Sequence, residues 1–378
     1  SQEKPLLYAG DLEFVWVDQP DPMLLSDLTA GQSDRDTVRA AIARHSDRVL
    51  LLRRTGPQEQ LLGYVSYRFL SDSLLFDALE DNGLSNRIRL RAAGNVLLIT
   101  SLAADTSDRH KNYSQLLLSE LLARALVQEC VYAVVRPHSG RLPDALDGLL
   151  TRFGFVSLEG DAPIREVDMH TPTVLIQNLE TTIQEPLCRN PRVLSAIDRG
   201  HRRLQMAITG LYPGCLVLTL SADIIHHRLL EKITAYNQVP AVPTTPRVLG
   251  ECMCVPFGKM LRGKIVPNTV TKTIHTDKVF TPDLSESSME AFPNYSPIPS
   301  QIRMIKSFNR PVILVDDIMH PGFRIQALDP ILREENVDIR MVLVGLLSGH
   351  GRDLMDAQGR PVDAVYYLPR LREWFVES

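Results

Sequence analysis

The sequence predicts an α/β protein built of two domains, and three features support this prediction. Apolar runs of strand length alternate with segments of helical spacing along the chain. At 378 residues, the chain is too long for one ordinary hydrophobic core. A polar stretch with two prolines, NLETTIQEPLCRNPRV, interrupts the alternation near residues 180 to 190. We therefore expect one domain over residues 1–182 and a second over residues 183–378.

Strand and helix patterns alternate along the first domain. Residues 61–69 alternate bulky with small or polar side chains, and residues 95–102, NVLLITSL, form the denser apolar run of a buried strand. Apolar residues at helical spacing predict a helix over residues 114–127. A short strand, a helix that Gly154 ends, and two further strands are expected over residues 131–135, 146–153, 155–158 and 166–176.

The second domain is predicted to open with a helix over residues 192–209, a strand over 215–220 and a helix over 224–236. Residues 240–300 are rich in Pro, Thr, Ser and Gly, which predicts short strands and loops. A strand, a helix, another strand and a glycine-punctuated loop then follow over residues 312–315, 324–335, 339–347 and 348–360.

Two adjacent acids, Asp316 and Asp317, follow the apolar run in the stretch VILVDDIMHPGFRI. Both cannot face apolar surroundings without a raised pKa or a loss of solvation, so at least one is expected to face a polar opening. A strand, a turn and a helix in succession are a common setting for a phosphorylated ligand in α/β proteins. The two carboxylates are then either acceptors for vicinal sugar hydroxyls or caps of the following turn.

The stretch VILVDDIMHPG resembles the phosphoribosyl-pyrophosphate (PRPP) motif of type I phosphoribosyltransferases. The resemblance implies a parallel sheet flanked by helices in the second domain. It also implies that Asp316 and Asp317 bind the ribose hydroxyls and that Mg2+ binds through the oxygens of PRPP. The implied phosphate-binding residues are His320, Gly322, Phe323 and Arg324, and the implied pyrophosphate-side residues are Ser221, Ala222 and Asp223.

This turn departs from the family pattern because the usual threonines are absent. Pro321 has no amide hydrogen to offer a phosphate. His320 and Arg324 could replace the missing donors, since a guanidinium forms a charged fork that suits phosphate. Alternatively, Arg324 is a solvated residue in the first turn of the helix.

A longer stretch, NVLLITSLAADTSDRHKNYSQLLLSELLARALVQECVYAVVR, resembles, together with LLTRFGF, the acyl-coenzyme-A-binding core of GNAT-type N-acetyltransferases. The resemblance implies a mixed sheet with helices and acetyl-coenzyme A (acetyl-CoA) as donor. In that family an outward-bending strand pairs with the pantetheine arm, and the turn into the next helix holds the pyrophosphate on unpaired amides. The implied acyl-CoA-binding residues are Leu102, Ala104, Arg109, Lys111, Asn112, Tyr113 and Ser114.

Three positions depart from that family pattern. Asn112 and Ser114 stand where the turn usually has small residues, but Asn tolerates left-handed backbone and Ser adds little bulk, so binding remains expected. Leu150 aligns with the tyrosine that often protonates the leaving thiolate. Acetyl transfer with another group in that role and a loss of activity therefore both remain open.

Composition excludes several classes of function. The net charge is −4 with acids and bases interspersed, which argues against a general nucleic-acid-binding surface. No run reaches the roughly 20 apolar residues of a membrane helix, and the N-terminal residues lack a secretory-signal pattern, so a cytoplasmic protein without a membrane partner is expected.

Sulfur and imidazole side chains give no metal signature. Five cysteines spread through the chain indicate reduced thiols. The pairs Cys252 with Cys254 and His226 with His227 lack the spacing of a zinc site, so no metal held by protein ligands alone is expected. His138 and His350 receive no assignment.

These features together predict a two-domain transferase of nucleotide or nucleobase-derivative metabolism. We expect acyl-CoA-dependent N-acetyl transfer in the first domain and phosphoribosyl transfer, or binding of a phosphoribosyl ligand, in the second. Its partners would be small-molecule nucleotides or phosphosugars, and a homodimer is compatible with this prediction. The alternative is a non-catalytic nucleotide-sensing protein, which the departures from both family patterns favour.

Overall fold

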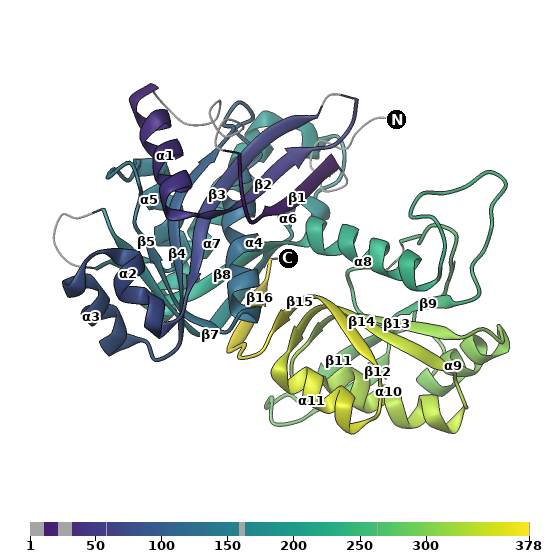
Figure 1. Cartoon of the computed structure of the whole chain (residues 1–378). Coiled ribbons are helices and arrows are strands. Elements are labelled where there is room, and N and C mark those ends of the chain that lie inside the picture. The colour runs from purple at the N-terminus through teal and green to yellow at the C-terminus, as the bar shows by residue number, and fades with distance from the viewer. Residues whose placement is uncertain (1–10, 22–31, 58, 159–162, 263, 378) are drawn as a thin grey trace. The chain divides into compact units, whose positions relative to one another are not determined.

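The computed structural model describes residues 11–21, 32–57, 59–158, 163–262 and 264–377 (Figure 1). The chain divides into two compact units. The first contains the residues before Ile224 and those after Pro369, and the second is Ile224–Pro369. Each unit combines strands with helices, which confirms the predicted α/β class. No helix among the described residues has both the length and the apolar character needed to cross a bilayer.

A nine-stranded mixed sheet forms the first unit. Its main path runs β1-β2-β3-β4-β5-β7-β16, and β6 and β8 also pair with β7. The pairs β4–β5, β7–β8 and β7–β16 are parallel, and the others are antiparallel. The strands are β1 (Leu12–Val17), β2 (Arg48–Arg54), β3 (Gln60–Leu70), β4 (Asn95–Ala104), β5 (Cys130–Val135), β6 (Val156–Ser157), β7 (Arg165–Gln177), β8 (Cys215–Ser221) and β16 (Glu373–Val376).

Seven α-helices accompany this sheet in the described part of the first unit: α1 (Gln32–His45), α2 (Leu75–Leu79), α3 (Asn82–Arg91), α4 (Tyr113–Val127), α5 (Asp144–Arg152), α6 (Leu179–Thr182) and α7 (Pro191–Leu211). Short 3₁₀ turns occupy Asp72–Leu74 and Leu187–Arg189. Apolar residues of α2 and α3, among them Leu79 and Ile88, pack with Leu98 of β4 and Val134 of β5 in one buried cluster. This burial is what holds the two short helices on the sheet.

A five-stranded parallel sheet forms the second unit, in the order β10-β9-β13-β14-β15. These strands are β9 (Met253–Pro256), β10 (Val270–Thr271), β13 (Val312–Met319), β14 (Ile339–Ser348) and β15 (Val362–Leu368), and β11 (Thr276–Phe280) and β12 (Ser287–Ala291) form a separate hairpin. The helices are α8 (Ala222–Tyr236), which starts at the end of the first unit, α9 (Ile298–Ser307), α10 (Phe323–Glu334) and α11 (Gly349–Ala357). Ile302, Leu328 and Met355 join α9, α10 and α11 to the core of the sheet around Leu314 and Val344.

Most elements predicted in the first half of the chain are confirmed. The strands β3, β4, β5 and β7 and the helices α4 and α5 lie where their periodicity predicted them. The helix α5 does end just before Gly154, as expected. In the second half, α7, α8, α10, β8 and β14 are also confirmed, as are short strands within residues 240–300. The helices α1, α2, α3 and α9 were not predicted.

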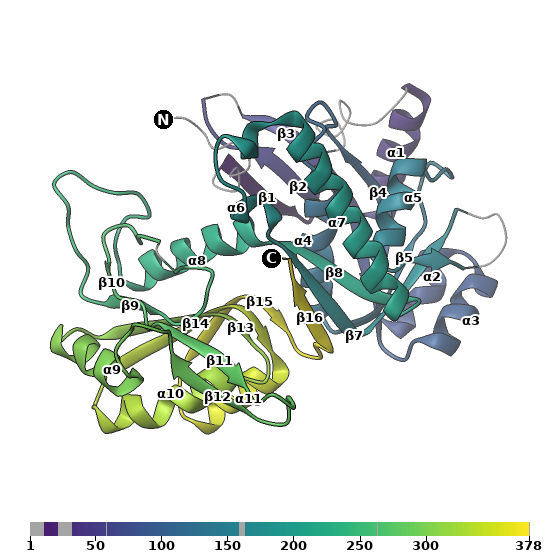
Figure 2. The same cartoon turned by 180° about the vertical axis from the view of Figure 1, so that it is seen from behind.

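The division into units differs from the predicted boundary between residues 182 and 183. The strand β8 pairs with β7 up to the Gln177–Ser221 pair, and β16 pairs with β7 from Thr173 to Ile176 (Figure 2). These backbone hydrogen bonds tie both later strands into the sheet of the first unit. The phosphoribosyltransferase resemblance implied that β8 is the first strand of the parallel sheet. This prediction is wrong, because β8 belongs to the nine-stranded sheet of the first unit.

The strand β13 is longer than predicted. It continues through Asp316 and Asp317 to Met319, and Asp316 pairs with Val344 of β14. The two acids thus lie within the strand and not after its end. Pairing with β14 on one side outweighs the low strand propensity of aspartate.

The predicted glycine-punctuated loop is wrong in part, because residues 349–357 form α11. Ser348 caps this helix by accepting a hydrogen bond from the Gly351 amide at 3.1 Å. A Cβ atom on Gly349 would lie 2.3 Å from the Pro369 carbonyl oxygen. Gly349 permits close backbone packing at the start of α11. Because glycine is also common in loops, the sequence alone predicted a loop here.

Gly154, just after α5, packs closely against β8. It allows the importance of close backbone packing at a glycine to be tested. Its φ is +97°, and a Cβ atom there would lie 2.1 Å from the Cys215 carbonyl oxygen. We expect Gly154→Ala to lower the free energy of unfolding by at least about 2 kcal/mol, from steric overlap and backbone strain. Urea denaturation measures the effect.

Gly148 within α5 is the matched control. A Cβ atom there meets nothing nearer than Arg152 Nη1 at 3.6 Å. Gly148→Ala should stabilise the protein by up to about 1 kcal/mol, because alanine loses less backbone entropy in a helix. Equal effects of the two substitutions would contradict the packing argument.

Candidate functional site

The strand β4 leaves part of one edge open. It pairs with β3 as far as the Gly63–Ala104 pair, but with β5 only as far as the Ile99–Val135 pair. On the β5 side the Arg136 amide also donates to the Ile99 carbonyl oxygen at 2.9 Å, and the last hydrogen bond runs from the His138 amide to the Thr100 carbonyl oxygen at 2.8 Å. Beyond it, within the described part of the chain, residues 101–104 have no strand partner on this edge. Such an edge offers its backbone groups to an extended ligand.

Thr100 is the point at which β4 changes its pairing. Ser66 of β3 faces Ser101, whereas Tyr67 faces Ile99, so Thr100 is an extra residue in β4. A β-bulge of this kind bends the strand and increases its twist. The predicted acyl-CoA-binding residues Leu102 and Ala104 lie on the segment after the bulge.

The turn between β4 and α4 uses several of its own amides. Asp105 accepts a hydrogen bond from the Ser107 amide at 2.9 Å, and Asp108 accepts one from the His110 amide at 3.0 Å. Asn112 caps α4 by accepting from the Gln115 amide at 3.1 Å. The expectation that this turn presents unpaired amides to an anion is therefore corrected, because side chains of the turn occupy three of them.

Tyr113 also has an internal role. It is buried, and its hydroxyl accepts a hydrogen bond from Arg54 Nη2 at 2.7 Å. Burial raises the pKa of its phenol, and the charge of Arg54 opposes this rise. The ring therefore anchors the start of α4 to β2, whatever it adds to ligand binding.

A cavity of about 420 Å³ lies beside the start of α4. Residues 105, 106 and 108–116 line it, together with side chains that the sequence does not bring near them: Arg152, Gln177, Glu180, Asp198, His201, Arg202, Gln205 and Ser221. The predicted residues Arg109, Lys111, Asn112, Tyr113 and Ser114 thus share one cavity. Ser221, predicted on the pyrophosphate side of the second domain, lies in this cavity of the first unit.

Positive charge in this cavity is only partly neutralised. The guanidinium groups of Arg109, Arg152 and Arg202 form no hydrogen bond or ion pair with any residue that the structure describes, and Nε of Arg152 is buried. Burial and the nearby charge of Arg202 lower the pKa of Arg152. The acids Asp198 and Glu180 are engaged elsewhere, with His110 at 2.9 Å and with His201. An anion entering the cavity would therefore meet guanidinium groups that lack a counter-charge.

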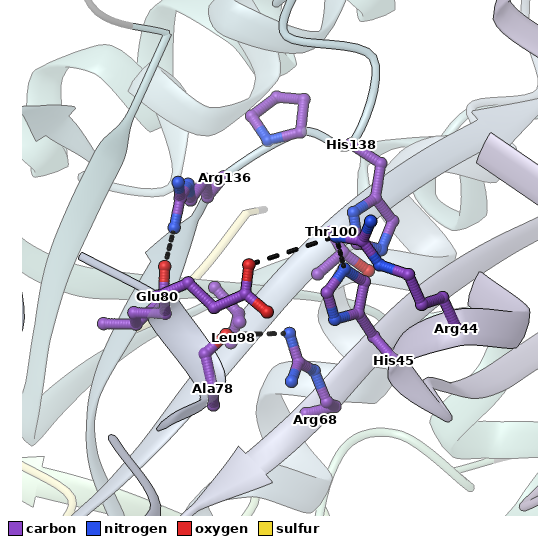
Figure 3. Close-up of a pocket in the computed structure, with 11 residues that line it drawn as sticks. Arg44, His45, Arg68, Ala78, Glu80, Leu98, Thr100, Arg136 and His138 are labelled. Atoms are coloured by element: carbon purple, nitrogen blue, oxygen red, sulfur yellow. Dashed lines mark hydrogen bonds and ion pairs between the residues drawn. The ribbon is translucent and has the colours of Figure 1, made fainter. Parts of the chain in front are cut away.

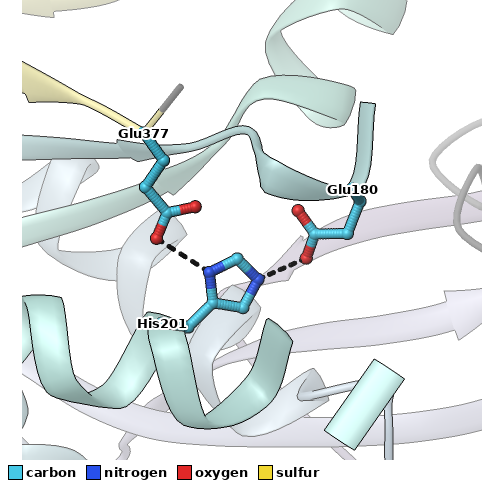
Figure 4. Close-up of side chains that lie close together, drawn as sticks. All are labelled: Glu180, His201 and Glu377. Atoms are coloured by element: carbon cyan, nitrogen blue, oxygen red, sulfur yellow. Dashed lines mark hydrogen bonds and ion pairs between the residues drawn. The ribbon is translucent and has the colours of Figure 1, made fainter. Parts of the chain in front are cut away.

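His201 in α7 lies between two carboxylates at the wall of this cavity (Figure 4). Its Nδ1 is 2.8 Å from Glu377 Oε1, and its Nε2 is 2.5 Å from Glu180 Oε1. The other oxygen of Glu377 accepts from the amides of Asn178 and Leu179 at 3.0 and 3.3 Å. Glu377 thus joins the end of the chain to α6 and α7.

The two carboxylates set the charge of His201. Burial alone would lower its pKa, but the hydrogen bonds to Glu180 and Glu377 and their charges raise the pKa to about 9. Burial would raise the pKa of Glu180, yet the hydrogen bond and charge of His201 lower it overall. The three ligand atoms lie within 4.8 Å of one another, as a metal site would require. In the absence of a metal, the protonated imidazole forms ion pairs with both carboxylates, whereas metal ligation would require its neutral form.

In the second unit, Asp317 is held by a neighbouring loop. It accepts hydrogen bonds from the amides of Lys259 and Met260 at 2.7 and 2.9 Å. The approach is close, because a Cβ atom on Gly258 would lie 2.6 Å from Asp317 Oδ1. Asp317 therefore caps the turn after β9 and not the turn that follows it in sequence.

Asp316 is buried and paired with Arg324, whose Nη1 lies 3.2 Å from Asp316 Oδ1. Burial and the adjacent charge of Asp317 raise the pKa of Asp316 to about 7, and Arg324 opposes the shift. Burial also raises the pKa of Asp317. Polar groups of the protein itself thus surround much of the two carboxylates, where a polar opening was expected. The ribose-binding role remains a prediction.

The predicted phosphate turn starts α10. Gly322 caps the helix with a φ of +98°, and the first helical amide with an acceptor is that of Gln326, bonded to the Gly322 carbonyl oxygen at 3.1 Å. Phe323 is half-exposed, and Lys278 Nζ lies 4.3 Å from its ring centroid. His320 is partly buried. Ala222 and Asp223, predicted on the pyrophosphate side, lie at the start of α8 and belong to the first unit.

Comparison with known proteins gives matches in solved structures alone, since no family model and no curated protein matches the chain. A structure of AtaT with acetyl-methionyl-tRNAfMet matches at 16% identity over 42% of this chain and 95% of that chain, with a TM-score of 0.28. A structure of AtaTR with AcCoA matches at 16% identity over 42% and 94%, with a TM-score of 0.30. An agmatine N-acetyltransferase mutant matches at 11% identity over 41% and 99%, with a TM-score of 0.28.

At such TM-scores the likenesses do not assign an activity by themselves. The residues described above carry the functional argument.

The His201 cluster predicts a dependence of stability on pH. A folded-state pKa of about 9, against an ordinary value of 6.5, gives stability that is full below about pH 6.5 and lost as the pH rises through 9. The size is on the order of 3 kcal/mol. His201→Gln should therefore be less stable than the wild type at pH 6, with a difference that shrinks by pH 10, in urea denaturation.

His170 is the control for this measurement. It lies 2.8 Å from Asp168, but both side chains are largely exposed. His170→Gln should change the unfolding free energy by less than about 1 kcal/mol, because exposed ion pairs contribute little. A His201→Gln effect that does not depend on pH would argue for packing and against the ion pairs.

Proposed function

We propose that the first unit binds an acyl-coenzyme A along the open edge of β4 and transfers its acyl group to an amine. The observation that carries this proposal is the order in which three features follow one another along one short segment. The bulge at Thr100, the unpaired edge of residues 101–104 and the charged cavity follow one another directly, since Asp105 lines the cavity. A long ligand with an amide-containing arm and phosphates suits this order.

The pantetheine arm would bind the open edge. Its two amide groups can pair with backbone groups of residues 101–104 as a short additional strand would. Because β4 already pairs with β3 on its other side, the edge is held rigidly before any ligand arrives. This supports binding roles for Leu102 and Ala104.

The phosphates would bind in the cavity. Its volume of about 420 Å³ lies within the usual range for small-molecule sites. Since Asp105, Asp108 and Asn112 occupy amides of the turn, side chains must supply much of the binding to the anion. Arg152 at the end of α5 and Arg202 in α7 are donors outside the set of predicted acyl-CoA-binding residues.

The acyl-transfer step needs a group that handles protons. Leu150 is buried in α5 and cannot protonate a leaving thiolate. Thiolates of coenzyme A are stable enough to leave without such help, so this position does not exclude transfer. The amine acceptor still has to lose a proton when it attacks the thioester.

Arg202 and Arg152 provide the test of the donor site. We expect Arg202→Gln and Arg152→Gln each to weaken acetyl-CoA binding about tenfold, since a hydrogen bond between charged groups contributes roughly 1.5–3 kcal/mol and these sites are partly solvated. Isothermal calorimetry at fixed ionic strength measures the affinity. Arg203→Gln is the control, because Arg203 is exposed on the same helix and does not line the cavity.

Equal losses in Arg203→Gln would indicate a general charge effect and contradict the assigned contacts. An absence of acetyl-CoA binding by the wild type at millimolar ligand would contradict the proposal itself.

A second candidate function concerns the second unit, where we propose binding of a phosphorylated sugar or nucleotide such as PRPP with Mg2+. The observation that favours it is the strand order. From β9 the chain goes first to β10 on one side and later to β13 on the other. Ligands of open α/β sheets bind outside the carboxyl ends of strands at such a switch point. Gly258, just after β9, approaches Asp316 and Asp317, which lie within β13.

The arrangement supports binding more than catalysis. The amides of the first turn of α10 remain for a phosphate, and Arg324 lies beside them. Asp317, however, is engaged with the loop after β9 and would need to exchange partners to hold a ribose. A sensor that binds a phosphosugar without turnover is therefore part of this second candidate.

Asp317→Asn tests the second candidate. We expect at least a tenfold loss of PRPP binding in the presence of Mg2+, because an amide cannot accept from both backbone donors and from a sugar hydroxyl with equal strength. Calorimetry measures the affinity, and thermal melting checks the fold. Asp353→Asn, at an exposed position of α11, should bind as the wild type does. Unchanged binding in Asp317→Asn would contradict the assignment.

A further inference from the structure

A second, smaller cavity lies on the first unit beside the β4 bulge (Figure 3). Its volume is about 200 Å³. It is lined by Thr100 of β4, Arg68 of β3, the end of α1 at Arg44 and His45, and Arg136 and His138 after β5. None of these side chains belongs to the cavity at the start of α4. Thr100 of β4 lines the smaller cavity, and Asp105, the residue directly after β4, lines the larger one.

A buried carboxylate holds one of these side chains in place. Asp47 is completely buried, and its Oδ2 lies 2.6 Å from His138 Nε2 and accepts a hydrogen bond from Thr100 Oγ1 at 2.7 Å. Its Oδ1 lies 2.9 Å from Arg68 Nε. With Arg68 beside its other oxygen, Asp47 is placed to accept the Nε2 hydrogen of His138. Asp47 thereby fixes both the orientation and the tautomer of the ring.

The other ring nitrogen of His138 is then free to act on a ligand. With the hydrogen on Nε2, Nδ1 carries the lone pair. Nδ1 has no hydrogen-bond partner within the described part of the chain, and the side chain is 11% exposed. His45 stacks on the ring at a centroid distance of 5.5 Å. A carboxylate, an imidazole with an unused lone pair and a cavity are the parts of a general-base site.

The backbone places His138 close to the expected position of the thioester group of the bound acyl-CoA. The His138 amide donates to the Thr100 carbonyl oxygen, and this is the last rung before the edge of β4 opens. A ligand that pairs with residues 101–104 and holds its phosphates in the larger cavity has its other end at Thr100. The acyl group and His138 would therefore meet at the bulge.

We propose that His138, oriented by Asp47, is the base for the acyl acceptor, and that the smaller cavity binds a small amine that carries an anionic group. This inference rests on the proposed acyl transfer. The amine nitrogen forms a bond to the thioester carbonyl carbon as the carbon–sulfur bond breaks. The electron pair of that bond leaves with sulfur, the amine proton passes to His138 Nδ1, and solvent finally receives it or the thiolate does.

The charges around the cavity indicate the acceptor class. Arg68 is balanced by Asp47, whereas Arg44 is 3.9 Å from Glu80 and Arg136 donates to the Leu79 carbonyl oxygen, which carries no charge. One guanidinium charge thus remains in excess. A carboxylate or phosphate on the acceptor would supply the counter-charge, and the small volume limits the acceptor, or its bound end, to about the size of an amino acid.

Another histidine–carboxylate pair, His110 with Asp198 at 2.9 Å, lines the larger cavity. It lies in the turn where phosphates would bind, and both side chains are about a quarter to a third exposed. This position suits binding of the acyl-CoA phosphates. The pair does not line the smaller cavity beside the bulge. The observations therefore favour His138 as the base.

The test uses the full chain with acetyl-CoA and three amine classes of matched length: α-amino acids, aminoalkyl phosphates and alkylamines without an anion. Thiol release measures kcat/KM against pH, and calorimetry measures acetyl-CoA affinity. We expect turnover of the anionic amines, with a kcat/KM, calculated for the unprotonated amine, that falls at low pH as the base is protonated. His138→Gln should lose about 10²- to 10⁴-fold in kcat/KM and lose this acid limb, with unchanged acetyl-CoA affinity.

Two further variants separate chemistry from structure. Asp47→Asn should reduce the rate as His138→Gln does if it folds, because the amide favours the wrong tautomer. His170→Gln is the matched control, since His170 forms a similar pair with Asp168 at 2.8 Å on an exposed part of β7. It should keep both the rate and the acid limb. Thermal melting of His138→Gln must match the wild type, so that lost rate does not reflect lost fold.

Each failure has a distinct meaning. Turnover whose acid limb persists in His138→Gln overturns the role of His138 and leaves the proposed function intact. Acetyl-CoA binding without turnover of any of these amines, or a preference for the alkylamines without an anionic group, overturns the acceptor class. An absence of acetyl-CoA binding overturns both the proposed function and the inference that rests on it.

Discussion

The first unit depends on β7, which is the strand that brings distant parts of the chain together. It pairs with β5 and β6 near its start and with β8 and β16 near its end. Backbone hydrogen bonding leaves little freedom in such pairs, so residues 215–221 and 373–376 have fixed positions relative to Gln177. The cavity beside α4 and the His201 cluster both depend on this pairing. Each combines residues in β7 or just after it with residues in or next to β8, β16 and α7.

Buried carboxylates present the same physical problem at several positions, and three of them illustrate different solutions. Asp47 is balanced by Arg68 and also hydrogen-bonded to His138 and Thr100. Glu377 is balanced by a protonated histidine and caps two amides. Asp316 has Arg324, but it also has a like charge beside it, so burial and repulsion raise its pKa. The first two carboxylates each have a cationic partner, whereas the third also lies beside a second acid within β13.

Sequence patterns predicted the elements but few of the contacts that make the sites. Helical spacing fixes α4, and a dense apolar run fixes β4, because both signals are local. His138 and Asp47 are separated by 91 positions, and His201 and Glu377 by 176, so no local pattern joins them. The partners of Asp317 are backbone amides, which every residue has, and these leave no trace in residue type at all. Asn112 was visible as a departure from a family pattern, and its capping role follows from its residue type once the helix start is known.

The turn before α4 explains why side chains matter more here than in a glycine-rich anion site. A bare helix start offers amides at no cost, but Asp105, Asp108 and Asn112 already satisfy amides of this turn. A phosphate that used the same amides would have to displace a carboxylate or an amide oxygen, and two of the displaced groups would repel it. The favourable approach is through the guanidinium groups on the other side of the cavity, which have no competing partner among the described residues. Binding that relies on mobile, partly solvated cations is more sensitive to ionic strength than binding to fixed backbone dipoles. The side-chain caps of this turn therefore alter how the cavity can hold an anion without removing its capacity to do so.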